Sequence, residues 1–154
     1  MRQLLSEAES VLTKEYLINL VDYILSFQRI FVSGMGKSFS PALLLQNLLR
    51  KYGMFVNTTP LDGLSEVAEN LSSDDLLIVF TVSATSSIME SLQHTDAKIL
   101  LITANPSKRL KQFADKIVVL PYLPPEPESC SISPALFSML VELIDLYIGE
   151  KLSH

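Results

Sequence analysis

Apolar residues follow two different patterns along this chain, and the patterns alternate. Between residues 4 and 27, apolar residues recur every three or four positions with charged residues between them, which predicts one long amphipathic helix. In the runs 76–82 and 98–103, apolar residues follow one another without polar alternation. Such runs are typical of strands that are covered on both faces of a parallel sheet. The sequence therefore predicts a protein of helices and buried strands.

The remaining segments continue this alternation, because turns rich in glycine, proline or hydroxyl residues separate short β-rich runs from helical patterns. The expected strands are 30–33, 54–56, 76–82, 98–103 and 116–120, and the expected helices between them are 40–51, 62–71, 87–92 and 107–113. A final helix is expected from 134 to 151 and is apolar nearly all round, as in helices that pack between a sheet and a neighbour.

Alternating strands and helices predict an α/β fold, a three-layer α-β-α sandwich around a five-stranded parallel sheet. Right-handed crossovers make the flavodoxin-like strand order 2-1-3-4-5 a common solution. With 154 residues, the chain has the usual size of one domain. We expect that domain to consist of an N-terminal helix (1–27), an α/β core (28–120), a proline-rich lid (121–133) and a C-terminal helix (134–152).

In that strand order, ligands bind beyond the carboxyl ends of the strands, where the winding reverses between strands 1 and 3. The loop after the first strand is GMGKS (34–38), and the loop after the third is SATSS (83–87). Glycine lets a ligand approach the backbone closely, and hydroxyl groups donate to anionic oxygens. One such serine is about as often only a helix cap. Two clusters beside one crevice favour a phosphate site.

The glycine spacing in the first loop argues against two nucleotide motifs. A Walker P-loop needs a glycine four residues before the Gly-Lys-Ser of residues 36–38, and a dinucleotide fingerprint needs a glycine where Phe39 stands. Neither glycine is present. No cofactor is expected, and the single cysteine, Cys130, has no second cysteine for a CxxC metal or redox pair.

Composition and charge indicate where the protein is located and which partners it has. Twelve Lys and Arg against seventeen Asp and Glu give a net charge of −5, so direct contact of this chain with nucleic acid is not expected. One cysteine forms no internal disulfide, which favours the reducing cytoplasm. The most apolar stretch is interrupted by Glu142 and Asp145, which argues against a membrane span. Only 19% of the residues are charged, and the apolar last helix predicts a homodimer or tetramer.

Three motifs resemble the SIS (sugar isomerase) domain family, and the resemblance extends over nearly the whole chain. Residues 34–38 are similar to the family signature G-x-G-x-S, residues 81–86 resemble S-x-S-G-x-T, and residues 102–105 resemble I-T-x-N, followed by an Ala-Asp pair at 114–115. The resemblance implies a phosphosugar-binding sandwich. The phosphate-binding residues expected from the loops and the resemblance are Gly36, Lys37, Ser38, Thr81, Ser83, Ser86 and Ser87.

Two features depart from the family pattern: the residue at position 84, and the crossover from Ser86 to Lys98, which is shorter than usual by about one helical turn. Ala84 stands where the family usually has glycine, and it stiffens or reshapes the loop if this position requires a positive φ.

The resemblance is closest to the phosphosugar-binding domain of RpiR-type transcription regulators, because the opening helix and residues 143–148 are similar to that domain. It implies a ligand sensor in carbohydrate metabolism and transcription regulation, rather than an enzyme. Two alternatives stay open: a phosphosugar aldose-ketose isomerase, and a dimerisation scaffold with a decayed pocket.

An isomerase needs an acid and a base beside the sugar. His94 precedes strand 4 and is expected at the far end of the sheet, so the weak catalytic candidates are Glu126 and Glu128 of the proline-rich lid. Exposed glutamates are usually only solvated charges. Lys108, Arg109 and Lys111 either support an acidic ligand or form a solvated helix face, and the solvated face is the favoured interpretation.

Overall fold

The structure, a computed structural model, describes residues 2–121 and 135–153. Its centre is a five-stranded sheet with the order β2-β1-β3-β4-β5, and every neighbouring pair is parallel. The strands are β1 (Arg29–Gly34), β2 (Phe55–Thr58), β3 (Asp75–Phe80), β4 (Lys98–Thr103) and β5 (Lys116–Val119). The predicted α/β class and strand order are confirmed.

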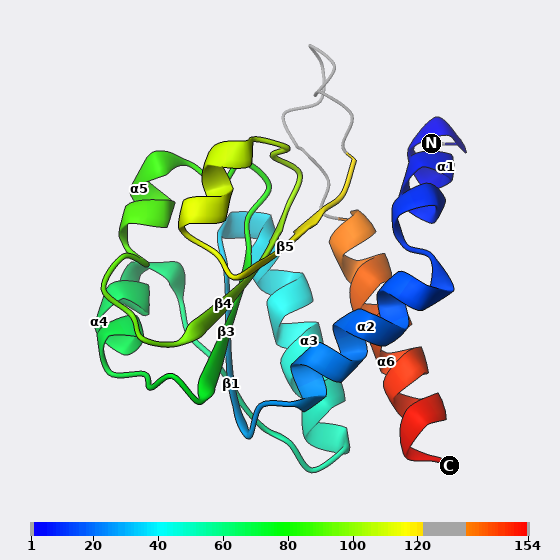
Figure 1. Cartoon of the computed structure of the whole chain (residues 1–154), viewed down its shortest axis with the longest axis horizontal. Coiled ribbons are helices and arrows are strands. Elements are labelled where there is room, and N and C mark those ends of the chain that lie inside the picture. Colours follow the sequence, from blue (N-terminus) through cyan, green and yellow to red (C-terminus); the bar gives the residue numbers. More distant parts are fainter. Residues whose placement is uncertain (1, 122–134, 154) are drawn as a thin grey trace.

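Helices cover both faces of the sheet and make the two outer layers of the sandwich (Figure 1). The face on one side carries α1 (Arg2–Val11), α2 (Lys14–Leu25), α3 (Phe39–Lys51) and α6 (Ala135–Leu152). The other face carries the short helices α4 (Leu64–Glu69) and α5 (Ser86–Glu90) and the 3-10 helix η3 (Lys108–Gln112). Two further 3-10 turns, η1 (Gly36–Ser38) and η2 (Leu61–Gly63), precede α3 and α4. Within the described residues, no helix is long and apolar enough to cross a membrane.

The sheet separates two apolar cores because successive side chains of a strand point to opposite faces. Leu76, Ile78 and Phe80 of β3 belong to a first core with α2, α3 and α6, and Leu77 and Val79 belong to a second core with α4 and α5. All five side chains are completely buried. The unbroken apolar run that predicted this strand is therefore explained by burial on both faces.

The N-terminal segment departs from the prediction of one helix over 1–27, which is wrong. Helix α1 ends at Val11 and α2 begins at Lys14. Between them Thr13 is extended, and its Oγ1 accepts a hydrogen bond from the backbone N–H of Tyr16 at 3.2 Å. This cap starts a new helix. The apolar period continues through the break, since Leu12 is also buried, so the hydrophobic pattern does not reveal it.

Two shorter helices also differ from their predicted form. The helix expected at 107–113 is the 3-10 helix η3, and the one expected at 62–71 is divided into η2 and α4. The proline-rich lid predicted at 121–133 lies outside the described residues, apart from residue 121.

An ion pair fixes the amino ends of the two central strands. Arg29 Nε and Nη2 donate to the carboxylate of Asp75 at 2.8 and 2.7 Å, and the backbone N–H of Ser72 donates to the same group. The hydrogen bonds from Arg29 hold the pKa of Asp75 below its usual value, although burial acts in the opposite direction. These contacts therefore join the start of β1 to the start of β3, away from the loops at the carboxyl ends.

Candidate functional site

The loop after β1 makes a tight turn that requires glycine. A Cβ on Gly34 would lie 2.2 Å from the carbonyl oxygen of Ser38, so only glycine lets the chain fold back here. Gly36 has a φ of +55°, in the left-handed region that favours glycine. Met35 N–H donates to the carbonyl of Phe80, which joins this loop to the end of β3. Ser38 is buried, whereas Lys37 is exposed.

Thr81 fixes the loop after β3 through its side chain. Its side chain is buried, and its hydroxyl oxygen accepts a hydrogen bond from the N–H of Ala84 at 3.2 Å. Ala84 has a φ of +46°, and its methyl group is buried in the second core. The departure from the family pattern thus falls at a position that does have a positive φ. Ser83 and Ser86 are exposed at the surface of this loop.

The loop after β4 is tied to the β3 loop through polar side chains. Thr103 Oγ1 donates to the carbonyl of Val82 at 3.0 Å, and Asn105 Nδ2 donates to the carbonyl of Ser83 at 2.8 Å. Asn105 Oδ1 in turn accepts from the N–H of Ser107 at 2.9 Å, and Ser107 Oγ caps η3 by accepting from the N–H of Arg109. A continuous chain of hydrogen bonds therefore sets the start of η3 relative to Ser83.

Between these two loops lies a surface hollow of about 310 Å³, which we call the β3–β4 hollow. Its polar lining consists of hydroxyl groups, one amide and one guanidinium: Ser83, Thr85, Ser86, Asn105, Ser107 and Arg109. Its apolar part is formed by Ala84, Met89, Leu110 and Phe113. No lining residue that the structure describes is a carboxylate. The lining suits a small molecule with an anionic group, since that group can accept several hydrogen bonds and neutralise one cation.

The structure separates the residues that the sequence predicted for one phosphate site. Ser83 and Ser86 line the β3–β4 hollow, and Thr81 supports its loop. Ser87 is exposed and contacts Thr85, 3.2 Å between the hydroxyl oxygens, without lining the hollow. Gly36 belongs to a second hollow of about 370 Å³ beside η2. The two remaining predicted residues, Lys37 and Ser38, line neither hollow.

The lid residues Glu126, Glu128 and Cys130 lie outside the described part of the chain. Sequence reasoning missed Asn105 and Ser107 as lining residues, and for Arg109 it favoured a solvated face over a contact with an acidic ligand. The signal for Asn105 was present in the I-T-x-N motif, but nothing in the sequence places Arg109 beside Ser83.

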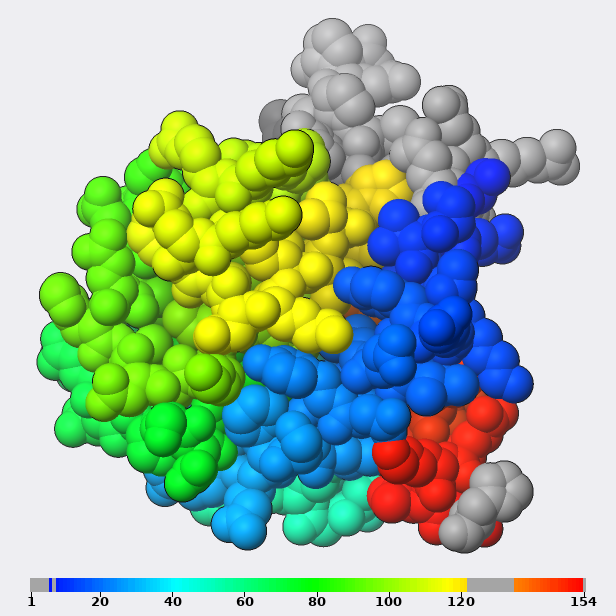
Figure 2. Space-filling view, viewed as in Figure 1, coloured from blue at the N-terminus to red at the C-terminus, as the bar shows by residue number. Residues whose placement is uncertain are grey.

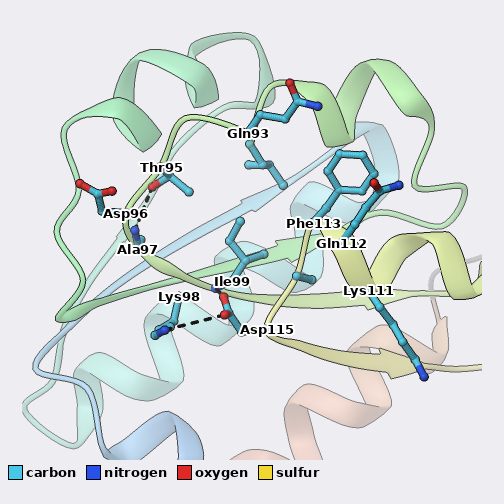
Figure 3. Close-up of a pocket in the computed structure, with 12 residues that line it drawn as sticks. Gln93, Thr95, Asp96, Ala97, Lys98, Ile99, Lys111, Gln112, Phe113 and Asp115 are labelled. Atoms are coloured by element: carbon cyan, nitrogen blue, oxygen red, sulfur yellow. Dashed lines mark hydrogen bonds and ion pairs between the residues drawn. The ribbon is translucent and has the colours of Figure 1, made fainter.

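A larger hollow, of about 480 Å³, lies at the opposite, amino end of β4 and β5 (Figure 3). Asp115 ties these strands together there: its carboxylate accepts from the N–H of Ile99 at 2.8 Å and faces Lys98 Nζ at 3.9 Å. Lys111 points away from the hollow (Figure 3). The carboxylate is thus already engaged in joining the strands. Parallel sheets of this order bind ligands at the carboxyl ends of their strands. We therefore favour the β3–β4 hollow as the ligand site, although its volume is smaller.

Comparison with known proteins agrees with this architecture. A model of the SIS domain matches residues 23–145 of the chain. No curated protein sequence matches it. The sugar isomerase domain of an RpiR transcription factor from Sphaerobacter thermophilus superposes with a TM-score of 0.81 at 20% identity, covering 97% of this chain and 86% of that one.

Two other solved structures have related folds. NanR of Vibrio vulnificus, complexed with ManNAc-6P, superposes with a TM-score of 0.75 at 17% identity over 99% of this chain and 59% of that one. A Methanococcus jannaschii protein, with an inferred function as a 3-hexulose-6-phosphate isomerase, gives a TM-score of 0.68 at 20% identity over 97% and 84%. Identities this low establish the fold alone. Because the family model covers most of the sequence, from near the end of α2 into α6, the chain belongs to the SIS domain family.

Proposed function

We propose that this chain binds a phosphorylated sugar and acts as the ligand-sensing domain of an RpiR-type regulator. The observation that carries the proposal is the lining of the β3–β4 hollow, where hydroxyl groups, an amide and a guanidinium surround an apolar floor. A phosphate offers several acceptor oxygens and negative charge, which match the donors. The apolar floor matches the carbon faces of a sugar ring.

The proposed sensing role is supported by the fold and by two solved structures that share it. One structural neighbour is the sugar isomerase domain of an RpiR transcription factor, and another, NanR, is complexed with ManNAc-6P. A sensor binds its ligand without converting it. The isomerase alternative needs an acid and a base, for which Glu126 and Glu128 were the candidates from the sequence.

The experiment is a thermal-shift screen with ManNAc-6P and other hexose and pentose phosphates, each paired with its unphosphorylated sugar. At one hundred times its dissociation constant, a ligand stabilises the folded protein by about 2.7 kcal/mol, which raises the melting temperature by several degrees. The expected result is a shift that requires the phosphate and that weakens in Ser83→Ala. Ser73→Ala, an exposed serine before the amino end of β3, is the matched control and keeps the full shift.

The outcomes separate the hypotheses. Binding without conversion of the sugar supports the sensor, whereas conversion that is lost in Glu126→Gln or Glu128→Gln supports the isomerase. If no sugar phosphate stabilises the wild-type protein, the proposal is wrong and the scaffold alternative takes its place.

We further propose that the regulatory unit is a homodimer formed through α2 and α6. These helices pack against each other, and residues of both lie side by side on the face of the molecule shown in Figure 2. Apolar side chains project from both, with Ile18 39% and Leu146 55% exposed. Exposed apolar side chains on two neighbouring helices are typical of subunit contacts.

A further inference from the structure

We infer that Arg109 is the residue that selects for the anionic group of the ligand, so that the phosphate is bound between the β3 and β4 loops and not at the β1 loop. This inference rests on the proposed phosphosugar binding and assigns that binding to one side of the sheet. It differs from the favoured sequence prediction, in which Lys37 and Ser38 of the β1 loop contribute, and it takes up for Arg109 the alternative of a contact with an acidic ligand.

The first argument is the position of the charge. Arg109 is the one charged side chain among the described residues that line the β3–β4 hollow. The other cation considered for the site, Lys37, lines neither this hollow nor the one beside η2. No ion pair of Arg109 is present within residues 2–121 and 135–153. Its guanidinium therefore enters binding without first having to leave a carboxylate.

The second argument is the local charge balance. The chain as a whole carries a net charge of −5, yet residues 104–114 contain three basic residues and no acidic one. These residues form the β4 loop and η3, directly beside the hollow. A local excess of positive charge in an acidic protein attracts an anion to this edge.

The third argument is preorganisation. The hydrogen bonds from Asn105 to Ser83 and from Ser107 to Asn105, at 2.8 and 2.9 Å, fix the β4 loop against the β3 loop. Ser107 then holds the backbone N–H of Arg109 at 3.3 Å. The backbone from which Arg109 extends and the β3 loop with Ser83 and Ser86 are thus fixed relative to each other before a ligand binds, which lowers the ordering cost of binding an anion.

The same lining also gives chemical selectivity. A guanidinium presents two parallel N–H groups that match two oxygens of a phosphate, and the neighbouring hydroxyl groups supply donors for the rest. A neutral sugar offers hydroxyl acceptors but no negative charge to pair with the guanidinium. Arg109 therefore discriminates between phosphorylated and unphosphorylated sugars, whereas the apolar floor contributes equally to both.

The test measures the affinities of wild type, Arg109→Ala and Arg109→Lys for the sugar phosphate that gives the largest thermal shift and for its unphosphorylated form, by isothermal titration calorimetry. Lys108→Ala and Lys111→Ala are the matched controls. Each removes one positive charge from the same 3-10 helix as Arg109, but neither residue lines the β3–β4 hollow. Lys111 belongs to the hollow at the amino end of β4 and β5.

We expect Arg109→Ala to weaken binding of the phosphorylated sugar by about 10- to 100-fold, the range for lost hydrogen bonds to a charged group. Arg109→Lys keeps the positive charge but loses the two parallel N–H groups of the guanidinium, so its affinity for the sugar phosphate is expected to lie between those of wild type and Arg109→Ala. Both controls should stay within about threefold of wild type, since screened charges outside the site contribute little. The melting temperature of each free variant should match that of the wild type, because all three side chains are exposed.

Two results would overturn the inference while leaving phosphosugar binding intact: an Arg109→Ala protein that binds the sugar phosphate like wild type, or controls that lose as much affinity. In either case Ser83→Ala still weakens binding if the proposed function is correct. If the wild-type protein binds no sugar phosphate, the proposed function and this inference fail together.

Discussion

Replacing Ala84 with glycine should cost this protein almost no stability, although the methyl group of Ala84 is buried. Ala84 is 4% exposed and packs in the second core, so its removal loses about 0.8 kcal/mol of apolar burial. Glycine also gives the unfolded chain more freedom, which costs about 0.4–1 kcal/mol. Against these losses, the φ of +46° strains an alanine by about 1–2 kcal/mol, and glycine relieves that strain.

The matched control is Ala97→Gly. Ala97 is 6% exposed, belongs to the same core and, like Ala84, lies outside the helices and strands. Ala84 is the one non-glycine residue with positive φ among the described residues, so Ala97 has no such strain to relieve. The control should therefore lose about 1–2 kcal/mol, whereas Ala84→Gly should stay within about 1 kcal/mol of wild type.

The assay is equilibrium unfolding in urea, followed by circular dichroism, with thermal melts as a second measure. For a chain of this size, 1 kcal/mol corresponds to a change of about 2–4 °C in melting temperature. The slope of free energy against urea concentration should be the same for both variants, because neither alters the surface exposed on unfolding. If Ala84→Gly is destabilised as strongly as Ala97→Gly, the reasoning about backbone strain is refuted.

Two further predictions concern the β1 loop and the oligomer. Gly34→Ala places a Cβ 2.2 Å from the carbonyl oxygen of Ser38 and should lower the free energy of unfolding by about 3 kcal/mol or more in the same urea assay. The control is Gly63→Ala, whose Cβ meets nothing within 4 Å, and it should stay within about 1 kcal/mol of wild type. Equal losses in the two variants would contradict the close approach at Gly34. Leu146→Glu should convert the proposed dimer into a folded monomer in sedimentation equilibrium, and a wild-type monomer would remove the basis for the proposed interface.

The sequence was sufficient for the sheet because the signals there are local and redundant. Residues 76–80 and 99–102 are apolar on both faces, and each run is followed by a turn-forming segment. The parallel order then follows from the alternation with helices. The break at Thr13 was not predictable in this way, since a single cap competes with an apolar period that continues through it.

The candidate site could be predicted only in part. Ser83 and Ser86 follow a buried strand, so their position at its carboxyl end is a matter of topology. Arg109 is different, because its place beside them depends on the turn from Asn105 to Ser107 and on a 3-10 helix. Periodicity predicts the existence of a helix there, but neither its type nor the direction in which its residues face.

The two apolar cores differ in how far apart their residues lie along the chain. Every buried residue of the second core lies between Leu64 and Leu110, whereas the first core combines residues from Ala8 to Ile148. During synthesis the ribosome has therefore delivered the complete second core while α6, which the first core needs, has not yet emerged. Until α6 emerges, the faces of β3 and β4 that belong to the first core are not covered by it. Contacts between residues so far apart in sequence also form slowly. Any chaperone that attends this protein during synthesis would thus meet that face of the sheet, and α6 is the segment that ends its exposure.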